Sequence, residues 1–402
     1  MALHDLSDFF SLSRSIYYNL SAAGAGREYI LMYITNKRPM PPVEKDIVRR
    51  TIDTVIQEYG DASRRLGPPA VQHPLRATAL LSRSSPRPDL LDILTEMLHD
   101  LFEDIYPFHF AANWKEIIYE EFVSFFEFER DFGRVLFERL DRLRAHEDET
   151  YYEYVGRLID TSDESRELVR IKMADRLDNT LDMRLDLQDT LEEEDFYKRI
   201  FEVVFLDLPI SAGMDHPPPS PLNGAWRLYS LFKNSVLLSL VRQRNAIGGD
   251  DASRNLFQAV AEASLKEAQR IFLHIMLYHR DTVDNPRGLV MDAMEYAASG
   301  RTSIITRPDG PHRLDGLFTS YFDHRPLITP EQAENMEPAE ARRAREDMKV
   351  RRKRRLAQLY EDKPLMIQAA LAFVSIFHAF LSDREYYVQG IRARGLAPSD
   401  DV

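Results

Sequence analysis

Apolar residues recur at helical spacing along most of this chain. A stripe at i, i+4, i+7 and i+8 begins at Val48, and the segment 90–102 carries eight apolar residues in a pattern typical of a buried helix. The same period predicts further helices over 114–143 and 168–183. Strict alternation of apolar and polar residues over five or more positions is hard to find. The pattern therefore predicts an all-α fold.

A proline cluster near the middle of the chain predicts a domain boundary. Four prolines fall between 217 and 221, and consecutive prolines cannot continue a helix. With 402 residues the chain is long enough for two domains. We expect an N-terminal extension (1–40), a helical domain (41–210), a Pro-rich linker (211–224) and a helical C-terminal domain without an assigned role (225–402).

The longest apolar stretch runs from Met366 to Leu381 and is interrupted by Gln368, Ser375 and His378. It is shorter than the roughly 20 residues that cross a bilayer, so we expect a buried core helix and no membrane association. The N-terminal sequence lacks a basic segment followed by an apolar one, so it predicts no signal peptide. We expect a cytoplasmic protein.

Composition excludes several classes of function. The chain has no Cys, which rules out disulfides, thiolate zinc sites, Cys-ligated iron–sulfur clusters and a Cys nucleophile. A net charge of −13 argues against a protein that coats nucleic acid.

The basic run within 342–355 is interpreted first as an exposed charged helix. A patch that binds anions, RNA or a partner protein is the alternative.

Acidic residues gather at the end of the apolar helix that begins at Leu90. His99 and Glu103 are spaced i, i+4, as are Asp100 and Asp104, so each pair shares a helix face. Three carboxylates at the negative end of a helix dipole repel one another and the dipole. A divalent cation would compensate them, and His and Asp are natural ligands for one.

A second anomaly is Asp175, a carboxylate that lies among apolar residues such as Ile171, Met173 and Leu177 on a helix that looks like core, where it needs a partner or a metal. Together with His73, His99 and Asp100 it forms a candidate ligand set. Two imidazoles and two carboxylates without thiolate suit Mn²⁺, Fe²⁺ or Mg²⁺ better than a structural zinc. Glu103 and Asp104 would then position water and transfer protons.

Three runs carry a resemblance to a known family. They are Arg64-Arg65-Leu66-Gly67-Pro68 with His73-Pro74, Met97-Leu98-His99-Asp100-Leu101-Phe102-Glu103-Asp104, and Lys172-Met173-Ala174-Asp175-Arg176-Leu177-Asp178-Asn179. The chain resembles the HD-domain metal phosphohydrolases over roughly residues 46–187. It is most similar to the hydrolase domain of the RelA/SpoT type and to small alarmone hydrolases of the stringent response. It departs from them at Pro68, Ala70, Asp178 and the run Thr95-Glu96-Met97.

The resemblance implies a helical bundle of the HD type that binds Mn²⁺, with Fe²⁺ or Mg²⁺ as alternatives. It implies His73, His99, Asp100 and Asp175 as metal ligands, Glu103 and Asp104 as the catalytic acid/base pair, and Arg64, Arg65, Lys172 and Asn179 as substrate-binding residues. Arg64 would pack on the purine and Arg65 would lie near the phosphates.

The activity that the resemblance implies is removal of pyrophosphate from the 3′ position of a purine nucleotide. The best candidate substrate is guanosine-3′,5′-bis(diphosphate) (ppGpp). Two alternatives stay open: another nucleotide phosphatase with an NADPH-like substrate, and a nucleotide-sensing regulatory protein with an HD fold. The departures flank the nucleotide pocket, so they bear on substrate choice rather than on the metal ligands. The sequence assigns no oligomeric state.

Overall fold

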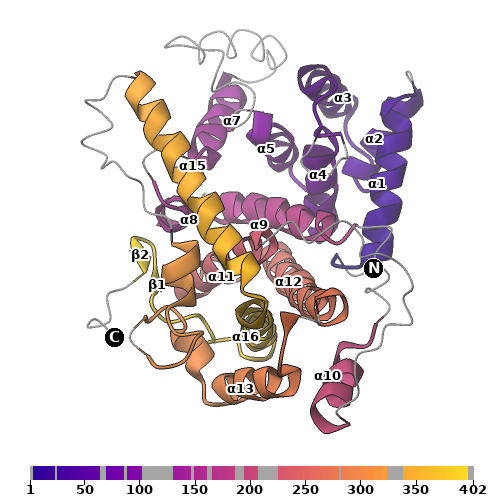
Figure 1. Cartoon of the computed structure of the whole chain (residues 1–402). Helices are drawn as coiled ribbons and strands as arrows, with labels where there is room; N and C mark the ends of the chain where they lie inside the picture. Colours follow the sequence, from indigo (N-terminus) through magenta and orange to yellow (C-terminus); the bar gives the residue numbers. More distant parts are fainter. Residues whose placement is uncertain are drawn as a thin grey trace. The chain divides into compact units, whose positions relative to one another are not determined.

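The computed structural model describes residues 3–22, 25–63, 69–85, 88–101, 130–145, 149–160, 165–185, 194–206, 225–279, 282–308, 310–323 and 338–396. Nearly all of the regular structure in them is α-helical (Figure 1). Two short strands, β1 (Ile391–Arg392) and β2 (Gly395–Leu396), pair antiparallel with Ile391 opposite Leu396. The prediction of an all-α fold is confirmed.

The helices of the first half follow the apolar periodicity closely, and Pro or Asp residues mark several of their starts. They are α1 (Leu6–Leu20), α2 (Ala25–Ile34), α3 (Pro42–Tyr59), α4 (Gln72–Ser84), α5 (Leu90–Asp100), α7 (Arg130–Leu143), α8 (Tyr151–Asp160), α9 (Ser165–Asp182) and α10 (Phe196–Phe205).

The second half is built in the same way. Its helices are α11 (Trp226–Gln243), α12 (Asp251–Tyr278), α13 (Pro286–Ala298), α15 (Pro338–Glu361) and α16 (Lys363–Ser382), with a 3₁₀ turn η5 (Arg301–Ile304) and a π-helical turn η6 (Phe318–Phe322).

The chain divides into two compact units whose boundaries differ from those expected from the sequence. The first unit comprises Met1–Ala145, Leu158–Asp182 and Ala246–Val260; the second comprises His146–Arg157, Met183–Asn245 and Ala261–Val402. Residues 1–40, expected to be an extension, belong to the first unit because the apolar faces of α1 and α2 enter its core. The expected linker 211–224 lies outside the described residues.

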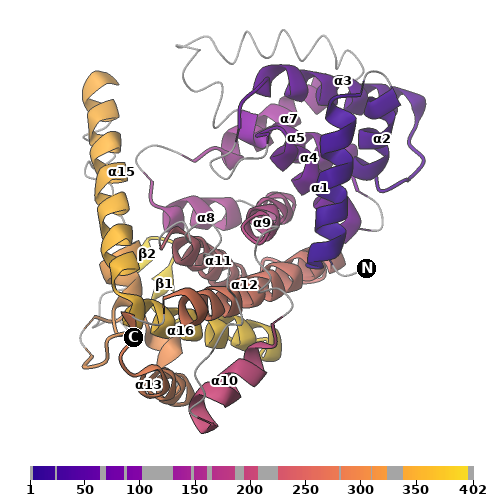
Figure 2. The same cartoon turned by 45° about the vertical axis from the view of Figure 1, so that its right-hand side comes forward.

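In the first unit, α4 is the helix around which the others pack. It contacts α1, α2, α5 and α9, and α5 in turn contacts α3, α7 and α9. Leu75 and Ala79 of α4 share an apolar core with side chains of α1, α2, α3, α5 and α7. These helices lie together in Figure 2. Because α4 is buried on almost every side, its polar residues must find partners inside the protein.

The second unit has a core of aromatic rings. Phe232 of α11 lies 5.0 Å from Phe318 of η6, and Phe318 stacks 5.6 Å from Phe373 of α16, measured between ring centroids. The predicted helix over Met366–Leu381 is confirmed as part of α16. By length and composition α16 could span a membrane, but two thirds of its most apolar window is buried within the protein. A core helix passes the same test.

The basic run lies on α15, where Lys349, Arg351 and Lys353 to Arg355 are largely exposed. Arg352 is half-buried, and its guanidinium lies 5.7 Å from the Trp226 ring and 5.5 Å from the Tyr229 ring. The run is therefore an exposed helix with one side chain anchored on aromatic rings.

Candidate metal centre

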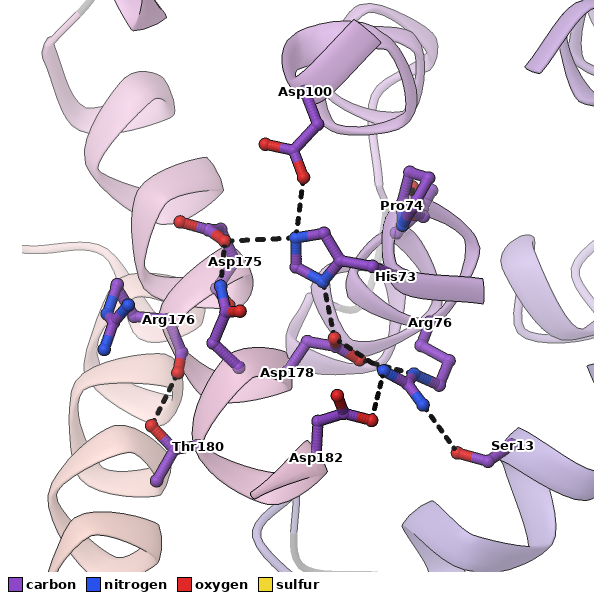
Figure 3. Close-up of polar contacts among 12 residues, drawn as sticks. Ser13, His73, Pro74, Arg76, Asp100, Asp175, Arg176, Asp178, Thr180 and Asp182 are labelled. Carbon is purple, nitrogen blue, oxygen red and sulfur yellow. Dashed lines mark hydrogen bonds and ion pairs between the residues drawn. The ribbon is translucent and has the colours of Figure 1, made fainter. Parts of the chain in front are cut away.

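His73 occupies the first turn of α4, and Pro74 follows it. Proline is tolerated there because the N–H groups of a first turn have no intrahelical acceptor. His73 is 4 % exposed, and its two ring nitrogens face different partners (Figure 3). Nε2 lies 2.9 Å from Asp100 Oδ2 and 3.3 Å from Asp175 Oδ1, whereas Nδ1 lies 2.5 Å from Asp178 Oδ2.

His99 is held on the last turn of α5 and is 3 % exposed. Its Nδ1 donates to the backbone carbonyl of Glu96 at 2.7 Å, so Nε2 keeps a lone pair in the neutral ring. Nε2 is buried and lies 3.0 Å from Asp100 Oδ1. A buried nitrogen of this kind is a suitable ligand for an ion.

The structure brings the four candidate ligands together from three helices. One ligand atom each of His73, His99 and Asp175 lies within 4.8 Å of the other two. Asp100 lies within ion-pair distance of both imidazoles. Imidazole nitrogens and carboxylate oxygens are donors for Mn²⁺, Fe²⁺ and Mg²⁺, so the residues fit the predicted class of ion.

Two predicted substrate-binding residues contact a candidate metal ligand. Lys172 Nζ lies 2.8 Å from Asp175 Oδ2, and the Asn179 amide donates to Asp175 Oδ1. Both come from α9, at i−3 and i+4 from Asp175, so the helix itself arranges these contacts. Their role toward a substrate stays a prediction. Arg64, Arg65, Glu103 and Asp104 lie outside the described residues.

The electrostatics of the cluster attract positive charge. Burial alone would raise the pKa of Asp100, but the imidazoles of His99 and His73 hold it well below its usual value. The pKa of Asp175 is likewise held low against burial, chiefly by Lys172. Burial would lower the pKa of His99, but Asp100 and Glu96 raise it to about 10. The carboxylates thus stabilise either protons on the imidazoles or a cation in their place.

A supporting layer that the sequence reasoning missed lies behind His73. Arg76, fully buried, donates from Nε to Asp178 Oδ1 at 2.9 Å and pairs through Nη2 with Asp182 Oδ1 at 2.7 Å. Arg76 Nη1 also donates to Ser13 Oγ of α1 at 3.4 Å (Figure 3). The carboxylate of Asp178 therefore orients His73, as outer carboxylates commonly orient metal-binding histidines.

Spacing could have indicated part of this layer. Asp175, Asp178 and Asp182 fall at i, i+3 and i+7, which is one face of a helix, and Arg76 lies one turn after His73. Asp178 appeared in the sequence only as a departure from the family pattern. Its position against His73 Nδ1 gives that departure a physical role.

Comparisons with known proteins give no independent assignment. No family model matches the chain, and neither a curated protein nor a solved structure matches it. Function therefore has to be argued from the site itself.

Proposed function

We propose that this protein is a metal-dependent phosphohydrolase of the HD type that acts on a purine nucleotide. The observation that carries the proposal is the buried group of His73, His99 and Asp175, whose ligand atoms lie within 4.8 Å of one another. Asp100 faces both imidazoles of this group. A nitrogen and oxygen donor set of this kind, held by three helices and free of thiolates, suits a catalytic divalent ion.

The proposal gives each residue a task. His73, His99, Asp100 and Asp175 would hold the ion, which would supply Lewis-acid chemistry for activating water and polarising a phosphoryl oxygen. Asp178 fixes the ring of His73, and the Glu96 carbonyl fixes the ring of His99. The resemblance adds Glu103 and Asp104 as the groups that transfer protons.

The substrate follows from the resemblance. Guanosine-3′,5′-bis(diphosphate) is our first candidate, with cleavage at the 3′ position and pyrophosphate as product. Arg64 would stack on the purine and Arg65 would neutralise phosphate charge, since phosphoryl transfer needs cations on the substrate oxygens. Lys172 and Asn179 would line the pocket near the ribose and phosphates, and both contact Asp175 in the structure.

The test is release of pyrophosphate and phosphate from guanosine-3′,5′-bis(diphosphate) with Mn²⁺, alongside a nucleotide panel that includes NADPH. Asp175→Ala and Glu103→Ala should abolish release. Asp251→Asn, at an exposed position of α12, is the matched control and should retain it. Bound Mn²⁺ without turnover of any nucleotide would overturn the hydrolase proposal and favour a nucleotide sensor.

A further inference from the structure

Glu96 of α5 is the least compensated buried acid among the described residues near the candidate metal centre. It is 0 % exposed, and neither of its carboxylate oxygens has a hydrogen-bond partner. Asp92, one turn earlier on the same helix, shows the usual arrangement: its two oxygens lie 2.8 Å from Arg139 and 2.8 Å from Arg170. A buried carboxylate without such partners is strongly destabilising unless something else compensates it.

Glu96 lies on the same face of α5 as two of the candidate metal ligands. Glu96, His99 and Asp100 fall at i, i+3 and i+4, so they share one helix face. The charges that act on the Glu96 carboxylate are those of His99, Asp175, His73 and Asp100, which are the four candidate ligands. Glu96 lies in the run Thr95-Glu96-Met97, where this sequence departs from the family that it resembles.

A comparison of the acids at the centre with the nearby lysines and arginines shows which acids lack a cationic partner of that kind. Lys172 compensates Asp175, and Arg76 compensates Asp178 and Asp182. Within the described ranges, no ion pair joins Asp100 or Glu96 to a lysine or arginine. These two acids therefore have the imidazoles of His73 and His99 as their compensating groups among the described residues. The compensation comes either from protons on the imidazoles or from a cation bound in place of those protons.

We propose that Glu96 is a further carboxylate ligand of the ion at this centre, beside His73, His99, Asp100 and Asp175. The inference rests on the proposed metal-dependent function and extends its ligand set. Glu96 is outside the group of ligand atoms within 4.8 Å, so ligation requires rotation of its side chain. Its oxygens have no hydrogen bonds to break in doing so. Three carboxylates and two imidazoles favour a hard ion such as Mn²⁺ over Zn²⁺.

The first test is calorimetric titration of the metal-free, full-length protein with Mn²⁺. Glu96→Gln keeps the shape of the side chain and removes its charge, so it should weaken Mn²⁺ binding by about tenfold or more. Asp92→Asn is the matched control, because it removes a buried carboxylate from the same helix but leaves the candidate ligands in place. Its Mn²⁺ affinity should equal that of the wild type.

The second test compares melting temperatures with and without Mn²⁺. Without metal, Glu96→Gln should melt close to the wild-type temperature, because the substitution replaces one buried polar group without hydrogen bonds by another of the same shape. With saturating Mn²⁺ the wild type should melt at the higher temperature, because tighter binding stabilises it more. A purely structural role for Glu96 would lower the melting temperature of the variant in both conditions.

Each result is decisive. If the wild type binds no Mn²⁺, the proposed function fails and this inference fails with it. If the wild type binds Mn²⁺ and Glu96→Gln binds it equally well, only the inference is overturned. A metal-free Glu96→Gln protein that has lost its helical circular dichroism also overturns it, because that result shows a structural role. Glu96→Met, which fills the same space without polar atoms, repeats the comparison.

Discussion

At the scale of single residues, His73 connects the candidate ligands to their support. Nε2 faces Asp100 and Asp175, whereas Nδ1 contacts Asp178. When Nδ1 donates its proton to the Asp178 carboxylate, the lone pair of Nε2 points to the ion site. The carboxylate of Asp178 therefore sets the tautomer and orientation of His73, although Asp178 is not itself a candidate ligand.

Replacement of Asp178 tests this control. Asp178→Asn should lower Mn²⁺ affinity by about 10- to 100-fold, because an amide no longer enforces the Nδ1–H tautomer. Asp182→Asn is the control, since it removes a contact of Arg76 but leaves His73 untouched. Equal Mn²⁺ affinities of the two variants in calorimetry would contradict the tautomer argument.

A second residue-scale prediction concerns His274 of the second unit. Its pKa is lowered to about 3, mainly by burial and then by His279, Arg227, Arg270 and Lys363. The unfolded chain takes up a proton below pH 6.5, while the folded chain takes it up only near pH 3. This residue therefore contributes a loss of stability as pH falls, about 1.4 kcal/mol per pH unit.

The measurement is urea unfolding of the wild type and His274→Gln at several pH values from 7 to 4. The free energy of unfolding of the wild type should fall more steeply with decreasing pH than that of the variant, whose side chain does not titrate. Parallel curves would show that His274 is protonated equally in the folded and unfolded chains.

The sequence predicted which residues would form the buried cluster of His73, His99 and Asp175, because their types and order are local patterns. His99 and Asp100 are adjacent in the sequence, and Asp175 stood out as a carboxylate among apolar residues of a predicted helix. Glu96 is different, since its missing partners become visible only once the surrounding helices are packed. The same holds for Arg76, because the sequence gives no sign that it pairs with Asp178, which lies 102 positions later in the chain.

At the scale of elements, Arg76 joins three helices. From α4 it reaches Asp178 and Asp182 on α9 and Ser13 on α1, and its guanidinium lies 4.9 Å from the ring of Phe9. Planar donors in a fixed fork suit two carboxylates on one helix face. The α4–α9 contact is therefore specified by charge as well as by apolar packing.

Substitution of Arg76 should show this coupling. Arg76→Met leaves two buried carboxylates uncompensated and should destabilise the protein by about 3–5 kcal/mol. Arg76→Lys should recover only part of the loss, because an ammonium group cannot reproduce the paired contacts. Urea unfolding at neutral pH measures both, and full recovery by lysine would contradict the geometric argument.

Helices themselves were easier to predict than their grouping. The expected helix from Leu90 is α5, and the one from Leu168 lies within α9, because a 3.6-residue period is read from neighbouring positions. No comparable sequence pattern marks the point where α12 divides between the two units. Its residues up to Val260 belong to the first unit and those from Ala261 to the second, without a Pro or Gly between them.

At the scale of the whole molecule, an ion at the candidate centre should act mainly on the first unit. All four candidate ligands belong to that unit, so Mn²⁺ should increase the hydrogen-exchange protection of α4, α5 and α9. Helices α13 and α16 of the second unit should exchange at unchanged rates. Mass spectrometry of peptides with and without Mn²⁺ checks this, and a uniform increase in protection would contradict a site confined to one unit.

The sequence distance across the His73–Asp178 contact has a consequence for protein synthesis. The two residues are 105 positions apart, so a ribosome that adds about 5–20 residues per second needs roughly 5–20 s to make the second after the first. During that interval α4 has its buried arginine and histidine, and Asp100 of α5 is present, but Asp178 and Asp182 are not. A nascent chain cannot complete the centre until α9 has emerged, so the proposed ion could be captured only after α4 and α9 have both been synthesised.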